Sequence, residues 1–147
     1  MICAIIGLVI SEFFMPEDGR VPDAQYYREV FTALCETVKP LAVTIRLLDV
    51  APDKNLKGIL PDDVVGGALG MQGARLFATE PVRSMLDAQL QAINELTEHY
   101  DIRILIPYLV NRQELEYWTK YINNALTRPV PVGAMVETPA SVLDLPN

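Results

Sequence analysis

A single carboxylate, that of Glu137, follows the apolar stretch 130–136 and precedes Pro139. The stretch predicts a buried strand, which would place Glu137 at the carboxyl end of that strand, where α/β proteins carry their chemistry. Taking a carboxylate out of water without a partner costs free energy, so a metal ion or a cation is expected beside it. The residue fits equally well as a cap of the next helix or as a side chain in solvent, and both interpretations stay open.

Arg46 is the second residue that points to chemistry, because it lies inside another apolar stretch, 41–50. A guanidinium is always charged and needs an anion in a buried strand, and a phosphate or carboxylate ligand matches its paired donors. The alternative is an ion pair inside the protein, which the sequence favours equally. The candidate partners for such a pair are Glu12, Asp49 and Glu137.

Other charged side chains carry less information. Lys54, Lys57 and Arg75 could add positive charge around a bound anion, although such side chains are more often simply solvated. His99, the single histidine, lies at the polar end of a predicted helix and is expected at the surface. This position gives little support to a histidine phosphoryl carrier or a catalytic triad.

The composition restricts the class of protein. The chain has 147 residues, 50% of them hydrophobic, and a mean hydropathy of +0.19, which predicts one domain over 1–147 with a sizeable core. A net charge of −7 and a pI near 4.6 argue against binding to nucleic acid, which needs a basic face. No apolar run reaches the roughly 18 residues of a membrane span. Cys3 and Cys35 are too few and too far apart for a disulfide framework or a zinc site, so the expected compartment is the cytoplasm.

Strand and helix patterns alternate along the chain. Apolar runs predict four buried strands, and apolar residues spaced three and four apart predict three helices between them. The predicted strands cover 1–9, 41–50, 102–110 and 130–136, and the predicted helices cover 24–38, 81–100 and 111–126. Asp23, Thr79 and Asn111 are suited to cap these helices. The glycine-rich stretch 51–79 is too long for a simple connection, so it is expected to be functional or to hold a short helix.

The alternation predicts an α/β fold. Buried strands joined by helices specify parallel βαβ units, in a doubly wound sheet or a barrel. A closed (β/α)8 barrel needs roughly 250 residues, so about four βα units predict a partial TIM barrel with an uncovered inner face and two open edges. A homodimer is therefore expected, in which two copies bury their inner faces against each other or join through their edge strands.

Five motifs occur in an order and at a spacing that point to one family. They are GLVISEFF at 7–14, TIRLLDV at 44–50 with Asp53 and Lys54, LGMQGAR at 69–75, RILIP at 103–107 and VGAMVETPA at 132–140. Together they resemble the C-terminal phosphoenolpyruvate (PEP)-binding TIM barrel of the PEP-utilising enzymes, which include enzyme I of the sugar phosphotransferase system, PEP synthase and pyruvate phosphate dikinase. The resemblance covers nearly the whole chain and implies phosphoryl transfer between PEP and a histidine.

The resemblance also implies roles for particular residues. Arg46 matches a binder of the PEP phosphate, and Glu137 matches one of two acidic ligands of Mg²⁺. Gln72 and Arg75 fall in the glycine-rich motif and complete the predicted substrate-binding set, but Ile10 and Gln72 both stand where the family has an arginine. The chain contains no counterpart of the family's second metal carboxylate, its enolate-protonating cysteine or its phosphorylated histidine.

These departures predict a PEP- or pyruvate-binding barrel fragment that binds its small anionic ligand weakly and is inactive in isolation. One arginine–phosphate contact must offset an association cost of roughly 4 to 15 kcal/mol. Mg²⁺ would be bound weakly or not at all by Glu137 as the single carboxylate. Two alternatives stay open: a Mg²⁺-dependent lyase of the citramalyl or hydroxyacid-aldolase kind, whose barrels carry a similar strand-terminal glutamate, and a non-enzymatic assembly remnant. Whether the chain itself is an enzyme stays undecided at this point.

Overall fold

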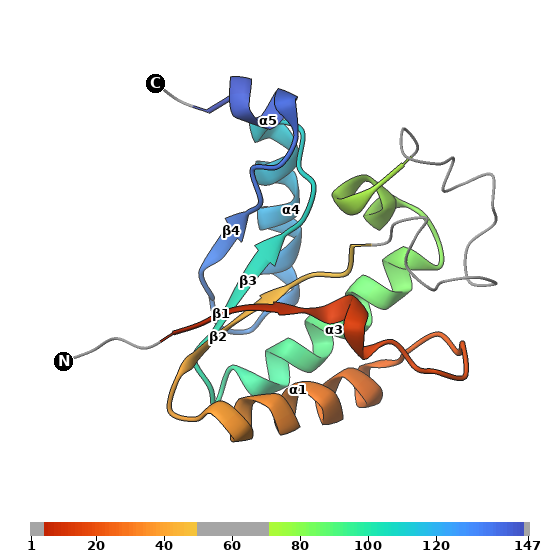
Figure 1. Cartoon of the computed structure of the whole chain (residues 1–147), viewed down its shortest axis with the longest axis vertical. Helices are drawn as coiled ribbons and strands as arrows, with labels where there is room; N and C mark the ends of the chain where they lie inside the picture. Colours follow the sequence, from red (N-terminus) through yellow and green to blue (C-terminus); the bar gives the residue numbers. More distant parts are fainter. Residues whose placement is uncertain (1–4, 50–70, 146–147) are drawn as a thin grey trace.

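The computed structural model describes residues 5–49 and 71–145 of the chain. One four-stranded parallel sheet, with the strand order β1-β2-β3-β4, organises the fold (Figure 1). The strands are β1 (Ile5–Ile10), β2 (Ala42–Arg46), β3 (Ile102–Ile106) and β4 (Val132–Ala134). Each strand lies within one residue of a predicted apolar run, because the β-branched residues of these runs suit a pleated and buried surface.

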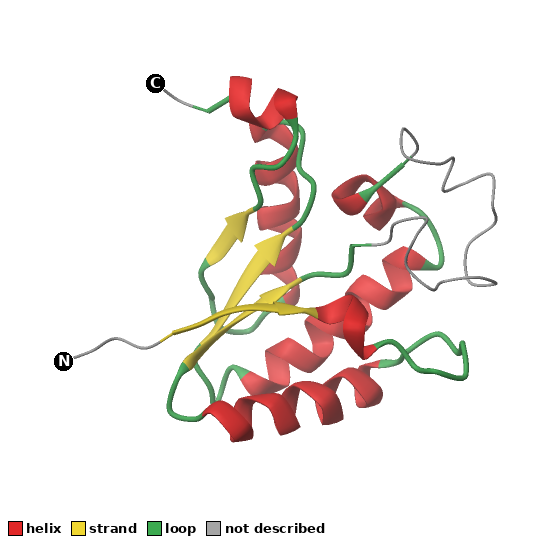
Figure 2. Ribbon diagram, in the orientation of Figure 1, coloured by secondary structure: helices red, strands yellow, loops and turns green. Residues whose placement is uncertain are grey.

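Helices connect successive strands, as the ribbon in Figure 2 shows. The α-helices are α1 (Ala24–Val38), α3 (Val82–Leu96), α4 (Arg112–Ala125) and α5 (Pro139–Leu143), and the 3₁₀ helices are η1 (Ser11–Phe14) and η3 (Gly73–Ala78). Parallel neighbours require such crossover connections. Helix α1 packs against α3, and α3 packs against α4, so the helices follow the order of the strands. Neither described range contains a helix that is long and apolar enough to cross a membrane.

Two of the three predicted helix caps are confirmed. Asp23 and Asn111 each accept a backbone N–H in the first turn of α1 and α4, at 2.8 and 2.9 Å. The cap predicted at Thr79 is wrong. Helix α3 begins after Pro81 without a side-chain cap, and the hydroxyl of Thr79 donates to the carbonyl of Leu76 at 2.8 Å instead.

One face of the sheet is buried under the helices. Adjacent residues of a strand point to opposite faces, and the register pairs Val9 with Ile45 and Ile45 with Ile104 in one buried row. These side chains join Phe31 of α1 and Leu86 of α3 in one hydrophobic core. Burial of such apolar surface stabilises a fold by about 25 cal/mol per Å², which makes this face the main source of stability.

The opposite face of the sheet is more open. Leu8 is 40% exposed, and Ile10 and Leu105 are half-buried. The register pairs Ile10 with Arg46 and Arg46 with Leu105, so these three residues form a row on this face. A parallel sheet with an open inner face agrees with a partial α/β barrel, whereas the barrel itself stays a prediction.

Candidate functional site

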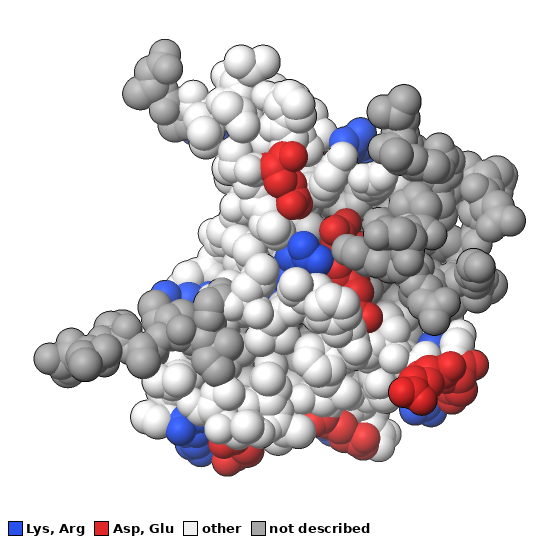
Figure 3. Space-filling model, in the orientation of Figure 1, with Lys and Arg blue, Asp and Glu red and all other residues white. Residues whose placement is uncertain are grey.

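The four parallel strands end at one edge of the sheet, which we call the carboxyl edge. Glu12 lies in η1 directly after β1, Arg46 is the last residue of β2, Tyr108 follows β3 and Glu137 follows β4. The ends of parallel strands meet at such an edge, so the two residues predicted to do chemistry, Arg46 and Glu137, lie at the same edge. Figure 3 shows basic and acidic side chains side by side near the centre of the face in view.

The guanidinium of Arg46 is paired inside the protein. Its side chain is 10% exposed, and its Nη2 contacts Oε1 of Glu12, whose side chain is only 4% exposed. Oδ2 of Asp49 lies 3.9 Å from the same Nη2. The internal ion pair, one of the two interpretations of Arg46, is therefore the arrangement that the structure shows.

The other two donor atoms of Arg46, Nη1 and Nε, have weak acceptors or none among the described residues. Nη1 donates to the sulfur of Met135 at 3.7 Å, and a thioether sulfur is a weak acceptor. Nε is buried and has no hydrogen-bond partner among residues 5–49 and 71–145. A buried donor without an acceptor costs free energy, so an oxygen atom that accepted a hydrogen bond from Nε of Arg46 would be stabilising.

Glu137 has a different partner from Arg46. Its Oε1 accepts the backbone N–H of Tyr108 at 2.8 Å, and its side chain lies at the surface. Tyr108 has a φ of 53°, a left-handed conformation that is uncommon for a residue with a side chain. This backbone conformation directs an N–H from the end of β3 to the carboxylate that follows β4.

The next helix is capped by Thr138 rather than by Glu137. Oγ1 of Thr138 accepts the N–H of Ser141 at 3.0 Å, and Oγ of Ser141 accepts the N–H of Thr138 at 3.2 Å, so the two residues form a capping box. Thr138 also donates to the carbonyl of Leu109 at 2.9 Å. The capping interpretation of Glu137 is therefore wrong, and its carboxylate is held at the carboxyl edge by Tyr108.

The predicted residues of the glycine-rich motif lie on η3 or directly before it. Gln72 is half-buried directly before η3, and Arg75 is exposed on it. Gly73 contacts the backbone of Tyr108, which brings this element next to the end of β3. Lys54 and Lys57 lie outside the described residues, as does most of the stretch 51–79. The part of that stretch that is described does hold a short helix.

The described residues do not form a metal site by themselves. No group of three or more His, Cys, Asp or Glu side chains that could hold a metal ion occurs in 5–49 or 71–145. Mg²⁺ takes six oxygen ligands in octahedral geometry, usually with one or two carboxylates. Glu137 offers one carboxylate, and one of its oxygens already accepts a backbone N–H. The described residues alone therefore do not fit the ion that the resemblance implies.

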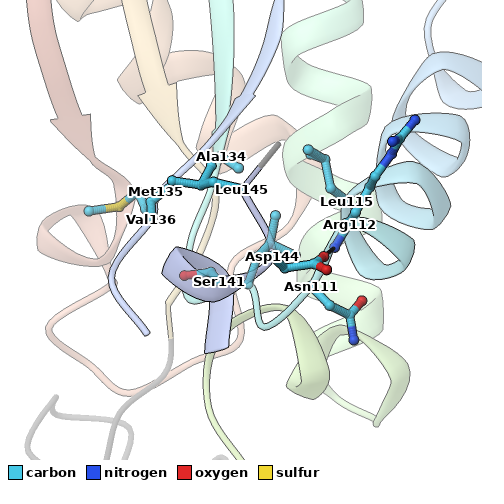
Figure 4. A pocket seen from close by; sticks show the side chains of 10 residues that line it. Asn111, Arg112, Leu115, Ala134, Met135, Val136, Ser141, Asp144 and Leu145 are labelled. Atoms are coloured by element: carbon cyan, nitrogen blue, oxygen red, sulfur yellow. Dashed lines mark hydrogen bonds between the residues drawn. The ribbon is translucent and has the colours of Figure 1, made fainter. Parts of the chain in front are cut away.

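A cavity of about 220 Å³ lies beside β4 and α5 (Figure 4). Its walls are mostly apolar, and Arg112 closes part of the rim by donating its backbone N–H to Asp144 at 2.5 Å. The lining residues are Leu109, Asn111, Arg112, Leu115, Ala134, Met135, Val136, Ser141, Asp144 and Leu145. Met135 belongs to both places, because it lines this cavity and also contacts Arg46.

One residue of the site, Met135, was missed by sequence reasoning. Met135 has a signal, because it lies two positions before Glu137 and a strand returns to the same face every second residue. Tyr108 falls near the end of the third predicted strand and so is expected at this place, whereas its left-handed conformation and its bond to Glu137 depend on contacts between distant parts of the chain. His99 is exposed, as predicted.

Comparisons with known proteins agree with the motifs. The family model described as "PEP-utilising enzyme, PEP-binding domain" matches residues 3–147. The phosphoenolpyruvate-protein phosphotransferase of Cupriavidus necator is 30% identical, over 96% of this chain and 26% of the relative. That of Borreliella burgdorferi is 29% identical, over 94% of this chain and 26% of the relative. The multiphosphoryl transfer protein of Rhodobacter capsulatus is 25% identical, over 97% of this chain and 17% of the relative. The chain thus spans about a quarter of the length of the first relatives it matches.

Proposed function

This chain belongs to the PEP-utilising enzyme family by its PEP-binding domain, and we propose that it is a PEP- or pyruvate-binding portion of such an enzyme, with Arg46 as the residue that binds the anion. The family match and the position of Arg46 at the carboxyl edge support this proposal together. Gln72 and Arg75, on the element beside the end of β3, remain proposed members of the same site.

One observation carries the proposal, namely the incomplete hydrogen bonding of the Arg46 guanidinium. Nine-tenths of this side chain is buried, yet Nε has no hydrogen-bond partner among the described residues and Nη1 meets only a sulfur. A guanidinium binds phosphate and carboxylate oxygens through short, charge-assisted hydrogen bonds. An oxyanion at this place would satisfy donors that the described protein atoms leave unsatisfied.

The transfer reaction belongs to the proposal for a longer enzyme. The relatives are named for phosphoryl transfer from PEP to a protein, and this chain covers a quarter of their length. His99, the only histidine, is exposed between α3 and β3 and so lies at the amino edge of the sheet, opposite Arg46. We therefore propose that this chain binds PEP or pyruvate and does not turn PEP over on its own.

The binding is expected to be weak. An anion must approach a guanidinium that already contacts Glu12 and lies near Asp49, and association itself costs roughly 4 to 15 kcal/mol. We propose a Kd for PEP above about 1 mM, which corresponds to a binding free energy less favourable than about −4 kcal/mol. Binding of Mg²⁺ stays a prediction from the resemblance. The location in the cytoplasm likewise stays a prediction.

The alternative functions lack a specific observation in their favour. The Mg²⁺-dependent lyase requires a metal site, and the described residues around Glu137 do not form one. The comparisons above give the lyase and the non-enzymatic remnant no support. Binding of PEP or pyruvate by a phosphotransferase-type barrel fragment is therefore the function that we retain.

We also propose that a second copy of the chain covers the open inner face. β1 and β4 are the two outer strands of a sheet in which all strands run in one direction. β4 of one copy can therefore pair in parallel with β1 of the other, and a twofold axis makes both junctions equivalent. Such a dimer would bury exposed apolar side chains of the inner face, such as Leu8.

Titration calorimetry with PEP and with pyruvate tests the proposed ligand. Removing Arg46 alone would leave Glu12 buried without its cation, so the test compares Glu12→Gln with the double variant Glu12→Gln/Arg46→Met. We expect binding in the single variant and none in the double variant. Arg128→Met is the matched control, because Arg128 is exposed before β4 at the opposite edge of the sheet. Binding that survives the loss of Arg46, or that is lost equally with Arg128, would contradict the proposal.

A further inference from the structure

We propose that Glu12 is an internal competitor of the anionic ligand, whose carboxylate occupies Arg46 and thereby sets how tightly an oxyanion can bind. This inference rests on the proposed function, since it concerns the regulation of the same site. It assigns to Glu12 a role in affinity that is separate from any role in holding the fold together.

The geometry places Glu12 where a ligand oxygen would bind. Glu12 follows β1 by two residues, and the register pairs Ile10 of β1 with Arg46 of β2. Its Oε1 contacts Nη2 of Arg46, which leaves Nε and Nη1 as the donors without an oxygen acceptor among the described residues. A ligand oxygen at Nε or Nη1 would share the same guanidinium with this carboxylate.

The burial of Glu12 makes the competition strong. Its side chain is 4% exposed, so water screens its negative charge poorly. Asp49, at 3.9 Å from the same Nη2, adds a second negative charge. Both carboxylates lie at the guanidinium that an incoming anion would have to approach, and each negative charge repels that anion. Loss of the Glu12 charge would remove one of these two repulsive charges from beside the anion.

Glu12 lies on a short element, η1, whose backbone carries no side-chain cap. η1 is a 3₁₀ helix of four residues, and Ile10 at its start provides no side-chain cap. Short 3₁₀ helices have poorer hydrogen-bond geometry than α-helices. Phe13 on the same element is 80% exposed, so this side chain adds little packing to hold η1 in place. Ser11 is buried and Phe14 packs against the core, so displacement of the carboxylate is expected to involve the side chain of Glu12 rather than the whole of η1.

The ligand chemistry is that of an oxyanion, either a phosphate group or a carboxylate. A phosphate ester presents three oxygens to the guanidinium, whereas pyruvate presents two. PEP carries both groups. Separate titrations with inorganic phosphate, pyruvate and PEP distinguish which group binds at Arg46.

The variant Glu12→Gln tests the competition. Glutamine keeps the size of the side chain and an oxygen that can accept from Nη2, so only the charge is removed. We expect this variant to bind inorganic phosphate at least about tenfold more tightly than the unmodified chain, because a buried charge beside the ligand is lost. Glu12→Ala, which removes the competitor entirely, must shift the affinity in the same direction. Glu17→Gln is the matched control, since Glu17 is exposed on the following loop and its variant has the same net charge.

The outcomes separate this inference from the proposed function. Arg46-dependent binding of PEP that is no tighter in Glu12→Gln or Glu12→Ala than in the unmodified chain would overturn the inference and leave the proposed function standing. An equal gain in Glu17→Gln would also overturn it, because a general charge effect would then explain the result. Absence of binding of all three anions in every variant would overturn both.

Discussion

Gly73 faces Tyr108 so closely that a Cβ atom on Gly73 would lie 2.2 Å from the Cβ of Tyr108. Both residues have left-handed backbones, with φ of 54° and 53°. Gly73→Ala should therefore lower the free energy of unfolding by more than about 2 kcal/mol, since it adds left-handed strain of roughly 1–2 kcal/mol and a steric overlap with rigid backbone. Urea denaturation followed by circular dichroism measures the loss.

Gly19→Ala is the control for this prediction. Gly19 also has a positive φ, of 75°, but nothing lies within 4 Å of an added Cβ. This variant should lose only the backbone strain, roughly 1 kcal/mol. Equal losses in the two variants would show that the contact with Tyr108 contributes nothing.

The buried pair of Arg46 and Glu12 should be strongly coupled. Arg46→Met leaves the carboxylate of Glu12 buried without its cation, and we expect a loss of about 3–5 kcal/mol in the free energy of unfolding. The double variant Arg46→Met/Glu12→Met should lose less than Arg46→Met alone, because no buried charge of the pair remains. Denaturation of the four proteins of this double-mutant cycle gives the coupling energy.

An exposed pair supplies the comparison for this cycle. Arg112 and Glu116 lie 2.8 Å apart, but their side chains are 73% and 63% exposed. Pairs of this kind contribute about 0.3–0.5 kcal/mol. A coupling energy for Arg46 and Glu12 as small as this would contradict a desolvated pair.

Two tyrosines should make the stability fall at high pH. Burial raises the pKa of Tyr27 well above its usual value, and the hydrogen bond to Glu36 raises the pKa of Tyr100 to about 12. A group whose pKa is higher in the folded than in the unfolded chain contributes stability that is complete below its unfolded pKa, here 10.0, and is lost as the pH rises through its folded pKa. The free energy of unfolding should therefore fall above pH 10.0.

Ultraviolet titration of tyrosine ionisation checks this pH dependence. Tyr100→Phe should remove one of the tyrosines that ionise at unusually high pH, and the ionisation of Tyr27 should remain unchanged. Ionisation of all six tyrosines near the usual pKa, with the protein still folded, would rule the prediction out.

The proposed dimer predicts a mass of twice 16.4 kDa by sedimentation equilibrium at micromolar concentration. Leu8→Lys should shift the protein towards monomer, since Leu8 lies on the open face and a buried lysine would need a partner. Leu143→Lys is the control, because Leu143 is 86% exposed on α5, away from the strands. A mass fixed at 16.4 kDa over a wide concentration range would mean that the chain does not self-associate.

The sequence predicts the sheet and two caps because these features depend on local pattern. Continuous apolar runs predicted the strands. Asp23 and Asn111 directly precede segments in which apolar residues recur every three or four positions, as in a helix. Thr79 failed as a cap of α3 because its hydroxyl donates to the last turn of η3, whose exact end the sequence pattern does not give.

The sequence predicted which residues belong to the candidate site better than it predicted the ion pairs and hydrogen bonds between them. Arg46 and Glu137 follow from charges at the ends of apolar strands, and both lie at the carboxyl edge. The choice of Glu12 as the partner of Arg46 depends on the register of β1 and β2, which composition does not encode. The bond from the N–H of Tyr108 to Glu137 could not be predicted for the same reason, since the two residues come together only through folding.

The two outer strands of the sheet, β1 and β4, differ in their tendency to start aggregation. β4 has only three residues and directly follows Pro131, so it offers a shorter row of backbone groups for pairing than β1 does. β1 has six residues, IIGLVI, and no proline. Fibrillar or amorphous self-assembly of partly unfolded chains should therefore begin at β1, and a charged substitution at Leu8 would slow it.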